Sequence, residues 1–269
     1  MLINILSSSC PLILSSFGAL FSEYTGCLAL FLDGLISFSA FLNFAYTVTL
    51  HSAVLGFLFS VLTSVILIFL FSLLIEKFKA NKFIASIALN LLFSALPSCL
   101  SSLGFGTRGV LTSPYFIYEI TAVRYFTLIW SILFVVLAVL FLSKTRYGLY
   151  LRITGSDSDV LVSKGINPSI TRIMGWSMTA LYSSFAGCFL SMRLSSFVPN
   201  ISSGRGWMAL AAVFLGQKKT WKITVCMIIF CFADFFSSNI QNIIPGIPSS
   251  VLLSFPYLIA LCLVFSNRV

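Results

Sequence analysis

The sequence predicts an all-α protein, a polytopic bundle of about eight to ten membrane-spanning helices. The 42 residues between Asp33 and Glu76 contain no Asp, Glu, Lys or Arg. That run is long enough to cross a bilayer twice, because a spanning helix needs about 20 apolar residues. Hydrophobic residues make up 59% of the chain and charged residues 9%, against about 25% charged in soluble domains. The apolar runs are continuous rather than alternating, which favours helices over barrel strands.

Nine apolar runs give the expected helices. They are 5–22, 26–44, 53–75, 83–103, 124–143, 173–193, 206–217, 223–241 and 250–266. The first contains no Lys or Arg, so we interpret it as a retained helix rather than a signal peptide. Segment 206–217 is too short for a full span. We expect it to be a half-helix that follows a re-entrant stretch over 194–205. Irregular backbone at membrane depth is tolerated only where protein or a water-filled cavity covers it, which points to a transport pathway nearby.

Three basic clusters separate the apolar runs and predict the topology. They lie at 76–82, within 144–172 and at 218–222, and positively charged short loops face the cytoplasm. The net charge of +9 therefore reflects membrane orientation rather than nucleic-acid binding. The stretch from about 104 to 123 is then external, as is the N-terminus. We expect a single membrane domain over 1–269, with a cytoplasmic loop over about 144–172.

The loop 144–172 contains a short helix signal. Ser156 or Asp157 can cap it, an acidic residue such as Asp159 suits its first turn, and Gly165 after Lys164 can end it. One interpretation is a solvated connecting helix. The other is a docking helix for a cytoplasmic partner, with Val160 and Leu161 as its apolar contacts.

Four short motifs, in order along the chain, resemble a known family. They are Gly18-Ala-Leu-Phe-Ser-Glu-Tyr-Thr-Gly26, Ala80-Asn-Lys-Phe-Ile-Ala-Ser-Ile-Ala-Leu-Asn90, Leu151-Arg-Ile-Thr-Gly155 followed by Lys164-Gly165-Ile166, and Pro199-Asn-Ile-Ser-Ser-Gly-Arg-Gly-Trp-Met-Ala-Leu-Ala-Ala-Val213. Together they are similar to the permease subunits of bacterial ABC importers for nucleosides and simple sugars. The order and spacing hold over about residues 10–265.

The resemblance implies a permease in the bacterial inner membrane that works with several partners. These are a second permease subunit, identical or homologous, two cytoplasmic ATP-binding subunits and an extracytoplasmic solute-binding protein. It also implies that the helix near 156–164, with Ser156, Asp157, Asp159, Val160, Leu161 and Lys164, couples to the ATPase. The family's stretch after the first motif is rich in Asn and Gly and ends in Glu-Gly. Here it reads Ala29-Leu-Phe-Leu-Asp33-Gly34.

Polar residues inside the apolar runs are the candidates for solute binding. They are Asp33, Asn43, His51, Asn90, Asp234, Asn239 and Gln241. Such groups either join helices by hydrogen bonds or face a cavity. We single out Asn90, Asp33, Asn43 and Asn239 as solute ligands, and Asn90 first, because an amide both donates and accepts. Arg205, between two glycines, either snorkels to the interface or guards the external mouth of the pathway.

Three functional hypotheses remain at this stage. The first is the ABC importer permease, carrying a nucleoside, a ribityl compound such as riboflavin, or a simple sugar. The second is a stand-alone secondary transporter that uses Asp33 and Asp234 as proton or ion relays. The third is a membrane-embedded enzyme, which the single His and seven scattered Cys do not favour. There is no phosphate-binding loop, so ATP hydrolysis would belong to partner subunits, and we expect no bound cofactor or metal.

Overall fold

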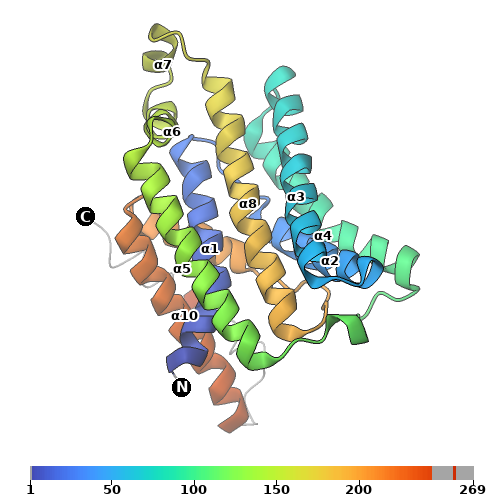
Figure 1. Cartoon of the computed structure of the whole chain (residues 1–269). Coiled ribbons are helices and arrows are strands. Elements are labelled where there is room, and N and C mark those ends of the chain that lie inside the picture. The colour runs from blue at the N-terminus through green and yellow to red at the C-terminus, as the bar shows by residue number, and fades with distance from the viewer. Residues whose placement is uncertain (1, 244–256, 259–269) are drawn as a thin grey trace.

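The computed structural model describes residues 2–243 and 257–258, with side chains for residues 7–236 and 257–258. This part of the chain is helical, as predicted (Figure 1). The helices are α1 (Leu2–Tyr24), α2 (Leu32–Leu50), α3 (Ala53–Lys77), α4 (Lys82–Phe105), η1 (Pro114–Phe116), α5 (Ile120–Lys144), α6 (Arg146–Ser156), α7 (Asp159–Ser163), α8 (Pro168–Leu194), α9 (Arg205–Leu215) and α10 (Thr220–Ile243). The expected helix 250–266 and the side chain of Asn239 lie outside the described residues.

Three of the described helices are long and apolar enough to cross a membrane. They are α3, α4 and α5. In the most apolar 18-residue stretch of each, no more than 28% of the residues are buried inside the protein. Large apolar side chains therefore cover their outer faces, among them Val54, Leu91 and Ile129. Because lipid tails are as apolar as these side chains, such faces fit a bilayer.

The centre of the bundle is α8, which packs against α1, α2 and α3 (Figure 1). Small residues allow these helices to approach closely. A Cβ atom on Gly18 of α1 would lie 3.3 Å from the Tyr182 Cβ atom, and one on Gly187 of α8 would lie 3.1 Å from the Ala40 amide nitrogen. Helix association in membranes depends on this close packing and on interhelical hydrogen bonds such as the one from Thr179 Oγ1 to the Gly18 carbonyl, 2.8 Å.

The second helix begins later than predicted, at Leu32 rather than 26, and continues to Leu50. Residues 25–31 are irregular because Gly26 takes a left-handed conformation, with φ of 70°. Their backbone groups are satisfied from other helices. The Cys27 carbonyl accepts a hydrogen bond from Trp176 Nε1 at 2.9 Å, and the Leu30 amide donates to Ser86 Oγ at 2.6 Å.

The predicted half-helix is present as α9, Arg205–Leu215, and 195–204 before it is not helical. The segment begins with a bridge between Leu111 and Phe197, which joins it to the stretch after α4. The other predicted boundaries differ by a few residues. Helix α5 begins at Ile120 rather than 124, and α8 begins at Pro168 rather than 173, capped by the Asn167 side chain.

The polar loop 144–172 contains more helix than expected, since α6 precedes the short α7. Figure 1 places both at the end of the bundle opposite the N-terminus. We call this end the basic end. It also holds the ion pairs of Lys82 with Glu76, 2.7 Å, and of Lys218 with Glu23, 3.0 Å. The three basic clusters of the sequence therefore gather on one side of the molecule.

The close approach of α2 and α4 yields a test of this packing. A Cβ atom on Gly34 would lie 3.0 Å from both Asn90 Oδ1 and Ser94 Oγ. We expect Gly34→Ala to destabilise the fold by about 1–3 kcal/mol, the usual cost of overpacking. Gly104 of α4 is the control, because a Cβ atom there meets nothing within 4 Å. Thermal unfolding in detergent measures both variants, and equal midpoints would contradict the predicted contact.

Candidate functional site

The first turn of α2 lies beside α8, inside the bundle. Just before it, Phe31 packs on Trp176, with ring centroids 5.1 Å apart. Trp176 is eight residues after the start of α8, and Gly187, which faces Ala40, is seven residues before its end. Helix α2 therefore starts about a third of the way along the 27 residues of α8, inside the bundle rather than at its end.

Helix α4 supports the start of α2 with polar side chains. The Gly34 amide donates to Asn90 Oδ1 at 2.7 Å, one turn beyond the bond from the Leu30 amide to Ser86. The Gly34 amide belongs to the first turn of α2, whose amides have no carbonyl partner within their own helix, and Leu30 lies just before that turn. Among the described residues, Asn90 Nδ2 has no hydrogen-bond partner, and Asn90 is only half-buried. One side of this amide is thus structural and the other is available to a solute.

Helix α9 meets the same turn of α2 from the other side. Asp33 Oδ1 accepts a hydrogen bond from the Gly206 amide at 3.0 Å, and Ser37 Oγ donates to Ser202 Oγ at 2.9 Å. An acidic side chain at a helix N-terminus satisfies an amide and opposes the positive end of the helix dipole. Asp33 therefore caps α9. We call the group Asp33, Gly34, Asn90, Arg205 and Gly206 the α2–α9 junction.

The Arg205 side chain extends from the junction to α10. Its Nη1 atom donates to the Ile201 carbonyl at 3.1 Å, and its Nη2 atom lies 3.6 Å from Asp234 Oδ2. A quarter of the Arg205 side chain and 37% of the Asp234 side chain are exposed. The secondary-transporter hypothesis assigned Asp33 and Asp234 as ion relays. In the structure Asp33 accepts a hydrogen bond at the N-terminus of α9, and Asp234 lies beside the Arg205 guanidinium group.

Asn43 does not join the junction. It is fully buried between α2 and α8, where Nδ2 donates to Ser191 Oγ at 3.0 Å and to the Cys188 carbonyl at 3.4 Å. Its Oδ1 atom has no partner in the described part of the chain. The structure thus brings together Asp33, Asn90 and Arg205 from three distant segments and leaves Asn43 in a helix interface.

The junction suits a neutral polar solute. Its carboxylate, Asp33, already accepts from the Gly206 amide, and its guanidinium, Arg205, lies beside Asp234 of α10. The remaining groups are the Asn90 amide and the N-termini of α2 and α9. Discontinuous helices whose ends meet near the middle of the membrane form the substrate sites of many transporters.

The candidate coupling segment lies at the basic end. Helix α7 is Asp159–Ser163. Before it, Asp157 Oδ1 accepts a hydrogen bond from the Asp159 amide at 3.0 Å, and after it Gly165 has a positive φ of 74°. The side chains of Ser156, Asp157, Asp159 and Lys164 are exposed.

The apolar residues of α7 divide between an inner and an outer face. Leu161 is completely buried, whereas Val160 is 39% and Val162 is 59% exposed. Leu161 therefore anchors α7 to its own chain. The apolar surface available to a partner is Val160 and Val162, and the sequence analysis did not single out Val162.

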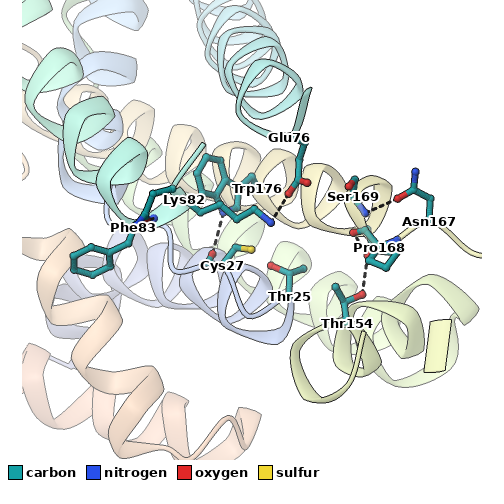
Figure 2. Close-up of polar contacts among 12 residues, drawn as sticks. Thr25, Cys27, Glu76, Lys82, Phe83, Thr154, Asn167, Pro168, Ser169 and Trp176 are labelled. Atoms are coloured by element: carbon teal, nitrogen blue, oxygen red, sulfur yellow. Dashed lines mark hydrogen bonds and ion pairs between the residues drawn. The ribbon is translucent and has the colours of Figure 1, made fainter. Parts of the chain in front are cut away.

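Hydrogen bonds fix this loop to the bundle. Figure 2 shows Thr154 of α6 directed at the start of α8, where it pairs with Thr171 Oγ1 at 2.7 Å. It also shows Asn167 capping α8 through the Ser169 amide, 2.9 Å, and, in the same view, the Glu76–Lys82 ion pair. The loop is therefore held at both ends, so a force on α7 is transmitted to the helices.

A second set of contacts joins α6 to the end of α1. The Tyr24 hydroxyl donates to the Lys218 carbonyl at 2.6 Å, and the Arg152 guanidinium carbon lies 5.2 Å from the Tyr24 ring centroid. A Cβ atom on Gly155 would lie 2.9 Å from the Gly26 amide nitrogen, so the two backbones touch. We call Glu23, Tyr24, Arg152, Gly155 and Lys218 the basic-end corner. The first and third family-like motifs of the sequence meet here.

Comparison with known proteins gives a consistent family. A family model described as "Branched-chain amino acid transport system / permease component" matches residues 1–262. The nucleoside ABC transporter permease protein NupC of Lactococcus lactis subsp. cremoris is 27% identical over 290 residues, covering 94% of this chain and 87% of the relative. The guanosine ABC transporter permease protein NupQ of Bacillus subtilis is 24% identical, covering 93% and 86%.

A third relative and one solved structure extend the comparison. The putative glucose ABC transporter permease protein TsgC13 of Haloferax volcanii is 25% identical, covering 86% of this chain and 75% of the relative. A chain of the structure of PsaBC from Streptococcus pneumoniae in complex with Fab has the same fold. The TM-score is 0.56 and the identity 14%, over 97% of this chain and 91% of that chain.

The Arg205–Asp234 contact can be tested by a double-mutant cycle. We expect Arg205→Gln and Asp234→Asn each to destabilise the chain by up to about 1 kcal/mol, because the pair is partly exposed. The double variant should lose less than the sum of the two, since the second change removes a charge that is already unpaired. Thermal unfolding of the four proteins measures the coupling. Strictly additive effects would contradict a direct ion pair.

Proposed function

This chain belongs to the family of branched-chain amino acid transport system permease components, and we propose that it imports a nucleoside as the permease subunit of an ABC transporter. The family membership carries the transport role. The names of two relatives, nucleoside and guanosine permeases that this chain covers over more than four-fifths of their length, support the solute class. The comparisons give no support to a stand-alone secondary transporter.

The partners follow from the same proposal. Two cytoplasmic ATP-binding subunits hydrolyse ATP, a second permease subunit completes the pathway, and a solute-binding protein delivers the nucleoside on the outer face of a bacterial inner membrane. The α2–α9 junction is the solute-contacting region, and the exposed face of α7 is the ATPase-docking surface. Helices with few charges at depth suit a neutral nucleoside better than a nucleotide, since a phosphate favours clustered Arg or Lys donors.

Asn90 is the first residue to test for solute contact. Asn90→Ala removes both the acceptor for the Gly34 amide and the Nδ2 donor. We expect nucleoside uptake by the reconstituted complex to require about fivefold more solute, because one lost hydrogen bond is worth about 1 kcal/mol. A nucleoside monophosphate should not compete with uptake.

Ser86→Ala is the matched control for Asn90→Ala. It removes an equivalent acceptor, the one for the Leu30 amide, from a fully buried side chain. Both variants should unfold at lower temperature, and only Asn90→Ala should raise the solute concentration for half-maximal uptake. Equal uptake curves for the two variants, or strong competition by the monophosphate, would exclude Asn90 as a solute ligand.

The proposed docking face of α7, Val160 and Val162, can be tested by introducing negative charge there. We expect the double variant Val160→Asp, Val162→Asp to lose solute-stimulated ATP hydrolysis, because two carboxylates would replace the apolar contact with the ATPase. The permease itself should still fold, since both side chains are exposed. Val110→Asp is the control, an equally exposed valine in the stretch predicted to be external. Normal stimulation in the α7 variant would place the ATPase elsewhere.

A further inference from the structure

Tyr24 connects two parts of the chain that otherwise lie far apart in sequence. Its ring faces Arg152 of α6, and its hydroxyl donates to the carbonyl of Lys218, 194 residues later. On the α6 side, the backbones of Gly155 and Gly26 are in direct contact, so no side chain lies between them that could move to absorb a displacement. A displacement of α6 is therefore transmitted to residues 24–26.

Lys218 is in turn rigidly attached to α9. The amides of Gly216, Gln217 and Lys218 donate to carbonyls of the last turn of α9, at 2.8, 3.1 and 3.3 Å. Gln217 and Lys218 both have positive φ, which closes this turn tightly against the helix end. Helix α9 has 11 residues and is about 16 Å long. Its other end is capped by Asp33 and paired with Asp234, at the α2–α9 junction.

Within the basic-end corner, Tyr24 contacts both sides, since its ring faces Arg152 of α6 and its hydroxyl donates to the backbone just after α9. The Lys218–Glu23 ion pair is formed by a side chain that is 44% exposed, and such pairs contribute little. The Tyr24 hydroxyl, by contrast, bonds a backbone carbonyl, which side-chain motion cannot shift. A movement of α6 and α7 therefore reaches α9 through Tyr24.

We propose that Tyr24 is a positioning residue for transport: it links the ATPase-docking element α6–α7 to α9 and so moves the cap of α9 on Asp33. The proposal rests on the proposed function, since it assumes that α7 receives the ATPase. In this mechanism ATP binding displaces α6, the Tyr24 hydroxyl pulls the α9–α10 turn, and the N-terminus of α9 shifts relative to α2. Tyr24 itself does not touch the solute.

The test uses the complete reconstituted complex with Tyr24→Phe, which removes only the hydroxyl. We expect the complex to assemble and to hydrolyse ATP at its basal rate, while solute imported per ATP hydrolysed falls about tenfold. Tyr182→Phe is the matched control, because the Tyr182 hydroxyl also donates to a backbone carbonyl, that of Phe134, at 2.9 Å. That variant should lose thermal stability and keep the wild-type ratio of import to hydrolysis.

A second readout follows the movement itself. Ser203 is exposed just before α9, so Ser203→Cys in a Cys99→Ser background reports on this end of the helix. We expect its labelling rate by a maleimide to change about threefold or more on adding a non-hydrolysable ATP analogue. That response should be absent when Tyr24→Phe is present. Arg152→Ala, which removes the contact from the α6 side, should reduce the response as well.

The outcomes separate the two proposals. A wild-type ratio of import to hydrolysis in Tyr24→Phe, or an unchanged labelling response, would overturn the role of Tyr24 while leaving the proposed function intact. Absence of ATP-dependent nucleoside import by the wild-type complex would overturn the proposed function, and the role of Tyr24 with it. A loss of stability in Tyr24→Phe equal to that of Tyr182→Phe, with no change in the import ratio, would make the hydroxyl purely structural.

Discussion

The structure depends on satisfying backbone amides where two helices, α2 and α9, begin inside the bundle. A buried backbone amide without a hydrogen-bond partner is costly. The chain supplies the partners from other helices: Ser86 and Asn90 of α4 for the start of α2, and Asp33 of α2 for the start of α9. The same contacts bring Asp33 and Asn90 together at the junction.

Glycine makes that arrangement possible. A Cβ atom on Gly206 would lie 2.6 Å from Asp33 Cα, and one on Gly34 would contact Asn90 and Ser94. Any larger residue would separate each amide from its acceptor. The candidate site is therefore built by close backbone contact first, and its side chains are oriented by their structural bonds. The Asn90 side chain, for example, uses its Oδ1 atom for the Gly34 amide, which leaves its Nδ2 donor without a partner among the described residues.

The sequence predicted the helical class and most helices because hydropathy along the chain measures burial in lipid. It also singled out Asp33, Asn90 and Arg205, since polar groups in apolar runs are few. It missed the late start of α2, because residues 27–31 are as apolar as the helix that follows. It also paired Leu161 with Val160, because a five-residue helix has too few turns for periodicity to identify its buried side. The late start of α2 and the burial of Leu161 depend on where the backbone turns and which face of a short helix is covered, and apolar composition indicates neither.

The roles of Asp33 and Arg205 illustrate why charge at depth need not mean charge transport. Asp33 neutralises the positive end of α9, and Arg205 neutralises Asp234, so the junction contains charged groups and little net field. The charged groups of the junction are thus compensated within the protein, which fits the proposed neutral solute and does not require a transported ion. A shift of α9 would change two contacts at once, that of Asp33 with the Gly206 amide and that of Arg205 with Asp234, because Arg205 and Gly206 both lie in the first turn of α9. The charge contacts that stabilise the junction therefore also make the charge exposed there depend on the position of α9.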